Sequence, residues 1–182
     1  MVILNDFDTS VRKALEEIDK NYESYDGLVV CGTHTSKEWE NIVLALKEAR
    51  ENKIPTLGIC FGLQMMVVEW ARNVVGWEDA QSTEIQLTAH PVVGKLPKLR
   101  VGVYAVGDRQ ESHWHNYAVN PYWTDGVLDK DWEVIRTGGI VEEIRLKGNQ
   151  FFMGVQYHPE YQSSKENPHP ILVNFINLCR KI

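Results

Sequence analysis

One cysteine, Cys60, lies in a sequence pattern that suits nucleophilic chemistry. It is the centre of the run Gly58-Ile59-Cys60-Phe61-Gly62, which follows a short apolar segment and opens a long amphipathic one. A strand-to-helix turn of this kind holds a nucleophile in a strained, exposed position, and its two glycines let strand and helix approach closely. The N-terminal dipole of the helix favours the thiolate over the thiol. The pattern predicts a cysteine-dependent acyl-transfer enzyme, or the relic of one.

A cysteine nucleophile needs a base, and the base needs a group that orients it. Of the six histidines, His158 is the strongest candidate, because it follows the apolar strand predicted over residues 151–157. Open α/β sheets place their sites at the carboxyl ends of such strands. Glu160, two residues further on, can hold the imidazole in one tautomer. The alternatives without catalysis are that Cys60 is a small buried core residue and that His158 and Glu160 form a structural pair.

The spacing of apolar residues predicts the elements that must position these side chains. In the first half, strands alternate with helices, which predicts a parallel sheet with right-handed crossovers. In the second half, strands follow one another and a helix ends the chain. Residues 77–97 are irregular and are a candidate loop or lid. The predicted strands cover residues 2–4, 28–31, 56–59, 100–104, 117–119, 132–137, 140–146 and 151–157, and the predicted helices about 9–20, 39–49, 61–75 and 170–181.

Composition excludes several classes of protein. The chain of 182 residues has a formal net charge of −6 with mixed signs, which predicts no nucleic-acid or membrane partner. Three dispersed cysteines argue against a disulfide scaffold and suit a reducing compartment. With no signal-peptide pattern and no long apolar span, we expect a cytoplasmic protein. His113 and His115 share a strand face without an evident third ligand, so we expect neither a metal site nor a cofactor.

Longer motifs reveal a family resemblance that extends from about residue 27 to the end of the chain. The chain resembles the class I, or triad-type, glutamine amidotransferases, and within them the glutaminase domain of CTP synthase. The resemblance implies a flavodoxin-like three-layer α/β fold, with a mostly parallel central sheet, helices on both faces and a small antiparallel extension. The motifs that carry it are residues 58–64, 69–74, 78–84 and 156–160, with a weaker match at 111–120.

The resemblance also implies a reaction, the hydrolysis of the glutamine side-chain amide, with the released ammonia passed to an acceptor site. Cys60 would form a thioester, His158 would act as acid and base, and Glu160 would orient His158. The implied oxyanion donors are the backbone N–H groups of Phe61 and of the Gly32–Thr33 segment. The implied substrate-binding residues are Gln64, Glu84, Asn116 and His34.

Two residues depart from the pattern of the family. Thr33 stands where CTP synthases carry a glycine, and a β-branched residue resists the positive φ that glycine tolerates. Asn116 stands where the family has an arginine for the α-carboxylate of glutamine, and an amide cannot replace a bidentate guanidinium.

The resemblance leads us to expect a single glutamine amidotransferase-like domain over residues 1–182, short at its N-terminus and without a synthetase domain. A separate synthetase or acceptor subunit is then one expected partner, and a second copy of the chain is another. Two alternatives to glutamine hydrolysis stay open. One is a hydrolase of another small amide or γ-glutamyl compound. The other is a catalytically degenerate homologue that serves as a binding or regulatory subunit.

Overall fold

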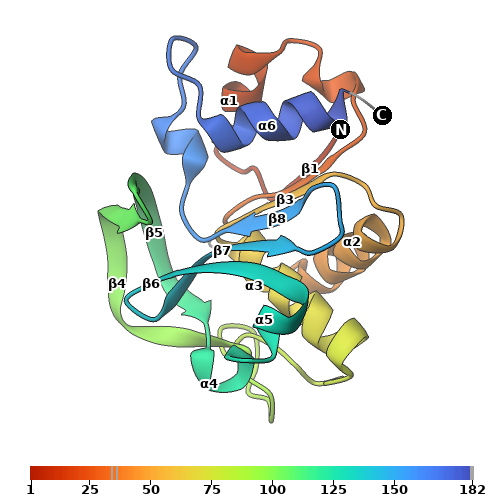
Figure 1. The fold of residues 1–182 in the computed structure, drawn as a ribbon, viewed down its shortest axis with the longest axis vertical. Helices are drawn as coiled ribbons and strands as arrows, with labels where there is room; N and C mark the ends of the chain where they lie inside the picture. The colour runs from red at the N-terminus through yellow and green to blue at the C-terminus, as the bar shows by residue number, and fades with distance from the viewer. Residues whose placement is uncertain (34, 36, 181–182) are drawn as a thin grey trace.

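A six-stranded sheet forms the centre of the computed structural model, which describes residues 1–33, 35 and 37–180 (Figure 1). The first four strands in spatial order are parallel, and the last two continue the sheet antiparallel. The predicted class, a mostly parallel sheet with helices on both faces and an antiparallel extension, is confirmed. In spatial order the strands are β1 (Val2–Leu4), β2 (Leu28–Val30), β3 (Thr56–Ile59), β8 (Phe152–Val155), β7 (Ile140–Leu146) and β6 (Trp132–Thr137).

Two apolar cores lie on opposite faces of this sheet. The alternation of side chains along β2 divides them: Leu28 and Val30 pack into one core, and Val29 packs into the other. Because both faces are covered, the strand is a continuous apolar run. Figure 1 shows one pair of helices above the sheet and the other below it. The upper pair is α1 (Ser10–Ile18) and α6 (Pro170–Cys179), and the lower pair is α2 (Trp39–Glu51) and α3 (Phe61–Trp70).

A long antiparallel hairpin, which we call the β4–β5 ribbon, stands apart from the main sheet. It consists of β4 (Val93–Val106) and β5 (Arg109–Val119), joined by a turn in which Gly107 has φ 60°. The predicted strands over 100–104 and 117–119 are therefore only parts of two much longer strands. Pro97 misled the prediction, because it lies within the stretch where the ladder register shifts and where a missing N–H costs no hydrogen bond.

Other element boundaries differ from the predictions in detail. The first helix ends at Ile18 rather than near residue 20. The segment predicted as one helix over 61–75 is α3 followed by a π-helical turn, Ala71–Val75, and ends at Gly76, whose φ is 87°. The candidate loop stops at residue 92, where β4 begins. The short elements are the 3₁₀ turns Tyr22–Ser24 and Pro159–Gln162 and the helices α4 (Pro121–Thr124) and α5 (Leu128–Asp131).

No helix within the described part of the chain is long and apolar enough to cross a bilayer.

Candidate active site

Cys60 occupies a strained turn between β3 and α3. Its φ of 53° and ψ of −102° lie outside the regions that L-residues favour, and its N–H donates to the carbonyl of Val155 at 2.7 Å. A Cβ at Gly62 would stand 2.1 Å from the carbonyl oxygen of Val30, and one at Gly58 would stand 2.7 Å from the backbone of Gly62. The two glycines therefore let helix and strands touch. Only 7% of Cys60 is exposed, so the turn presents it to a cavity rather than to open solvent.

His158 follows β8 and faces the nucleophile turn. Its Nδ1 lies 2.7 Å from Oε1 of Glu160, and its backbone N–H donates to the carbonyl of Ser112 at 2.8 Å. Its Nε2 is buried and has no hydrogen-bond partner among the described residues. Burial by itself lowers the pKa of His158, but interactions with Cys60 and Glu160 outweigh it and raise the pKa to about 10. The imidazole is therefore held protonated between the cysteine and the carboxylate at neutral pH.

Gly32, at the end of β2, sets how closely the two catalytic candidates approach. A Cβ at this position would lie 2.8 Å from Cε1 of His158 and 3.4 Å from Cβ of Cys60. Only a hydrogen atom fits there without moving the imidazole. The structure thus adds a steric role to the oxyanion role that the resemblance implies for Gly32.

A cavity of about 330 Å³ opens in front of Cys60 and brings the predicted site residues together. His34, predicted to meet substrate, lies outside the described residues. The remaining nine predicted residues all line the cavity, from five separate segments of the chain. They are Gly32, Thr33, Cys60, Phe61, Gln64, Glu84, Asn116, His158 and Glu160.

The backbone around the implied oxyanion hole accommodates a threonine. Thr33 is not among the described residues that adopt a positive φ, so the residue type that stands here is not strained. Its hydroxyl donates to the carbonyl of Thr35 at 2.9 Å and accepts from the N–H of the same residue at 3.0 Å. On the other side, Phe61 is the first residue of α3, so its N–H has no acceptor within the helix.

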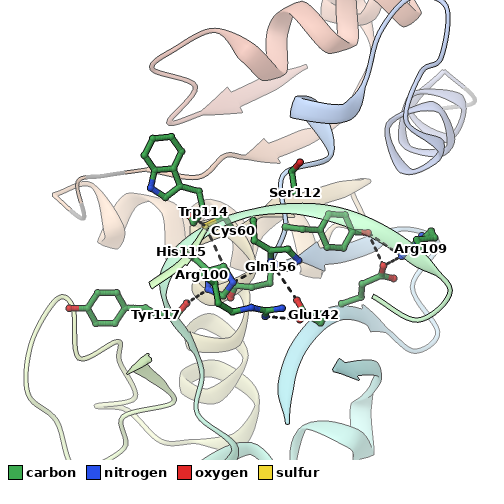
Figure 2. A network of polar contacts seen from close by, with 12 residues as sticks. Cys60, Arg100, Arg109, Ser112, Trp114, His115, Tyr117, Glu142 and Gln156 are labelled. Atoms are coloured by element: carbon green, nitrogen blue, oxygen red, sulfur yellow. Dashed lines mark hydrogen bonds and ion pairs between the residues drawn. The ribbon is translucent and has the colours of Figure 1, made fainter. Parts of the chain in front are cut away.

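Two buried glutamines connect the nucleophile to the β4–β5 ribbon (Figure 2). Nε2 of Gln156 lies 3.7 Å from the sulfur of Cys60. Nε2 of Gln64 donates to the carbonyl of Tyr117 at 2.9 Å and to Oε1 of Gln156 at 3.4 Å. The amide nitrogen of Gln64 is therefore engaged within the protein, so only its carbonyl oxygen is left to meet a substrate.

Ion pairs with two buried carboxylates anchor the ribbon to the antiparallel edge of the main sheet. Arg100 on β4 donates to Glu142 at 2.7 Å. Arg109 on β5 pairs with Glu143, which also accepts from the hydroxyl of Tyr157 at 2.7 Å. Figure 2 shows the pair of Arg100 and Glu142 as a dashed line. Both ion pairs position the wall that contributes Trp114, Asn116 and Tyr117 to the cavity.

Sequence reasoning missed contributions from two segments. The ring of Tyr161 stacks on His158, with centroids 4.6 Å apart and planes at 5°. The signal was its position directly after His-Pro-Glu, since the 3₁₀ turn there folds the chain back over the imidazole. The segment between β1 and α1 also lines the cavity, through residues that include Asn5, Asp6 and Asp8. No motif marks that segment, so the sequence offered no signal for it.

The histidine pair of β5 is buried. Among the described residues, no group of three or more histidine, cysteine, aspartate or glutamate side chains could hold a metal ion. Nδ1 of His113 lies 3.3 Å from Nε2 of His115. Burial lowers the pKa of His113 to about 3 and that of His115 to about 4, so both rings are neutral at neutral pH.

Comparison with known proteins agrees with this geometry. The family model described as glutamine amidotransferase class-I matches residues 2–178. CTP synthase of Sulfurisphaera tokodaii is 38% identical over 196 residues, which cover 92% of this chain and 36% of that protein. CTP synthase of Thermus thermophilus is 36% identical over 194 residues, which cover 88% of this chain and 35% of that protein. The chain thus spans about a third of the length of these relatives.

Solved structures share the fold. The Trypanosoma brucei CTPS glutaminase domain with bound acivicin has a TM-score of 0.84 at 24% identity, covering 100% of this chain and 94% of that one. A putative GMP synthase component from Thermoplasma acidophilum has a TM-score of 0.66 at 18% identity, covering 99% of this chain and 93% of that one. The resemblance to the glutaminase domain of CTP synthase is thereby confirmed. Because the solved structures are less than 25% identical to this chain, they show a shared fold only.

Proposed function

Because the chain belongs to the class I glutamine amidotransferase family, we propose that it hydrolyses a glutamine side-chain amide through Cys60, His158 and Glu160. The observation that carries the proposal is the buried Nε2 of His158, which faces Cys60 beside the strained nucleophile turn and makes no hydrogen bond to any other described residue. A buried nitrogen without a partner is costly and needs a reason. Proton transfer to and from reacting groups at Cys60 supplies one, because Glu160 already occupies the other ring nitrogen.

The first half of the proposed reaction forms a thioester. The sulfur of Cys60 attacks the carboxamide carbon, so that a carbon–sulfur bond forms and the carbonyl oxygen becomes an oxyanion. The carbon–nitrogen bond then breaks, and the protonated His158 gives its proton to the departing nitrogen, which leaves as ammonia. The raised pKa of His158 suits this step, because the imidazole enters it already charged.

The second half regenerates the enzyme. Water attacks the thioester carbon, the now neutral His158 accepts a proton from that water, and the carbon–sulfur bond breaks to release glutamate. Glu160 stabilises the imidazolium in both halves. The N–H groups of Phe61 and of the Gly32–Thr33 segment are the proposed oxyanion donors, each typically worth about 10²–10³ in rate.

We also propose that the released ammonia serves an acceptor reaction. The curated relatives are CTP synthases, and this chain matches about a third of their length. A synthetase domain or subunit that accepts ammonia is therefore the proposed partner.

The decisive experiment is covalent labelling of the folded protein by the diazoketone analogue of glutamine. We expect a single adduct at Cys60, and ammonia release from a glutamine amide that is lost in Cys60→Ser. Cys179 is buried outside the cavity lining and serves as the internal control. If the folded protein gains no adduct and releases no ammonia from any amide, while its thiols react after unfolding, the proposal is wrong.

A second variant tests the approach of His158 without touching a titratable group. In Gly32→Ala the new methyl group displaces the imidazole, so we expect labelling and turnover to slow by about 100-fold. Gly94→Ala is the matched control, since its Cβ would meet nothing closer than 3.6 Å. Equal rates in the two variants would contradict the proposed role of His158.

A further inference from the structure

The charge of the cavity in front of Cys60 bears on which amide it accepts. Among the described residues that line it, four are acidic and none is a lysine or an arginine. The acids are Asp6, Asp8, Glu84 and Glu160. Free glutamine has both an α-ammonium and an α-carboxylate group, and a carboxylate taken out of water needs a cation or several N–H donors.

The two described histidines that line the cavity do not supply a cation for the α-carboxylate. His158 is charged, but Glu160 holds one of its nitrogens and the other faces Cys60, where the reacting amide must lie. His115 is neutral, because burial lowers its pKa to about 4, and its Nδ1 donates to the carbonyl of Tyr117 at 2.9 Å. Asn116, the residue at the arginine position of the family, is uncharged.

Acidic groups reach the cavity from separate segments of the chain. Asp8 accepts from the N–H of Ser10 at 3.1 Å and from its hydroxyl at 2.7 Å, and the hydroxyl bond is the largest cause of its lowered pKa. Asp8 is therefore ionised at neutral pH, and it is exposed at the cavity. Glu84 contributes a second carboxylate from the irregular segment before β4. Two such groups favour a substrate whose α-ammonium is free.

The rim of the cavity is apolar where a longer substrate would leave it. Phe7, Leu99, Trp114 and Tyr161 line the cavity, and each is exposed by between 46% and 70%. On the ribbon this surface continues outward, because Val101, 51% exposed, is the cross-strand partner of Trp114. Exposed apolar side chains gathered at the opening of a site indicate a ligand that extends over them.

We infer that the substrate is a glutamine residue with a free α-ammonium and an α-carboxyl held in an amide bond, as at the amino end of a peptide. This inference rests on the proposed amide hydrolysis and specifies its substrate. The side-chain amide reacts at Cys60, the ammonium faces the acidic groups, and the next residue packs on the apolar rim. Water is consumed, ammonia leaves, and the glutamine residue becomes a glutamate residue with its backbone amide bond intact.

Three substrates test the inference with the wild-type protein: glutamine, glutamine α-amide and glutaminyl-leucinamide. Ammonia release gives kcat/KM, and mass spectrometry identifies the product as the side-chain acid. We expect both amide-linked substrates to exceed glutamine by about tenfold or more, because the free carboxylate loses hydration without gaining a cation. N-acetylation of glutamine α-amide should reduce its turnover by removing the ammonium. If glutamine matches or exceeds either amide-linked compound, the inference is wrong.

Two variants that each add a positive charge test where the preference for amide-linked substrates arises. Asn116→Arg places a guanidinium in the cavity and should narrow the preference for amide-linked substrates. Asn174→Arg makes the same change on the exposed side of α6, outside the cavity lining, and should leave the preference unchanged. An equal shift in both variants, or none in Asn116→Arg, would contradict recognition at the α-carboxyl position.

Labelling separates this inference from the proposed hydrolysis. The diazoketone analogue of glutamine is compared with its α-carboxamide, and the rate of adduct formation at Cys60 is measured for each. A faster adduct with the carboxamide supports the inference, even when no amide is hydrolysed and the hydrolysis proposal fails. A faster adduct with the free carboxylate contradicts the inference and leaves the hydrolysis standing. If neither reagent labels Cys60 and no amide releases ammonia, both proposals fail.

Discussion

Two walls of the active-site cavity are held in place by different forces. The wall that carries Cys60 and His158 is built on β3, α3 and β8, where apolar side chains are fully buried and glycines let backbone touch backbone. The opposite wall is the β4–β5 ribbon, whose outer face is exposed and whose inner face is anchored by charged groups.

Because the two walls are held differently, the residues that carry the proposed reaction are separate from the residues that select the substrate. Steric contacts between backbones fix the nucleophile and its base, and such contacts tolerate little change. The ribbon contributes Trp114 and Asn116 through a few charged contacts, so its side chains can vary without moving the nucleophile turn. A chain with this division can keep one chemistry while it changes the compound on which it acts.

The largest effect on stability is expected from a substitution in the wall that carries the nucleophile. In Gly62→Ala the new Cβ would lie 2.1 Å from the carbonyl oxygen of Val30, and neither backbone can move aside. We expect the free energy of unfolding to fall by about 3 kcal/mol or more, as for severe overpacking. Urea unfolding followed by tryptophan fluorescence measures the change. Gly94→Ala, on the ribbon, is the control and should cost less than about 1 kcal/mol; a comparable loss in both would remove the contrast between the walls.

A smaller effect is expected when the ribbon loses an anchor. Glu142→Gln removes the charge that pairs with Arg100, whose side chain is only 12% exposed, and leaves that guanidinium uncompensated. We expect a loss of about 3 kcal/mol in the free energy of unfolding, together with a changed substrate preference.

Asp129→Asn is the matched control for this change of acid to amide. Asp129 pairs with Arg136 at 2.7 Å, but its side chain is 45% exposed, so its loss should cost less than about 1 kcal/mol. If the two variants lose the same stability, the ribbon is not anchored by its buried charges.

The two walls also differ in how far the sequence could predict them. Gly58, Cys60 and Gly62 form a local pattern, and the roles of such a turn follow from strand and helix geometry alone. His158 could be added because the end of a buried strand has a known place in an open sheet. The contact of Gly32 with His158 could not, since it depends on the exact distance between two neighbouring strands.

The ribbon was harder to predict because its pairing is nonlocal. Its strands contain a proline and many polar residues, so periodicity identified only fragments of them. Glu142 and Glu143 are acidic residues of a predicted strand, and both are buried where the ribbon packs over them. The local sequence of a strand does not indicate that a segment distant in the chain will bury it.

The smallest expected effect is on the pH dependence of the free energy of unfolding. A histidine on each wall contributes to this dependence, and the two contributions have opposite directions. The pKa of His158 is about 10 in the folded protein, above its ordinary value of about 6.5. Its contribution to stability is therefore full below pH 6.5 and is lost as the pH rises through about 10. His113, on the ribbon, has a pKa lowered to about 3, so its contribution is full above pH 6.5 and is lost as the pH falls toward 3.

Urea unfolding as a function of pH measures both limbs. In Cys60→Ser the sulfur whose interactions raise the pKa of His158 is absent, so stability should fall less steeply between pH 6.5 and 10, with the acid limb unchanged. In His113→Phe the group that must stay neutral is absent, so stability should fall less steeply on the acid side, with the alkaline limb unchanged. If either variant flattens the limb assigned to the other, the two walls share one titrating network, and the separation of chemistry from substrate choice is wrong.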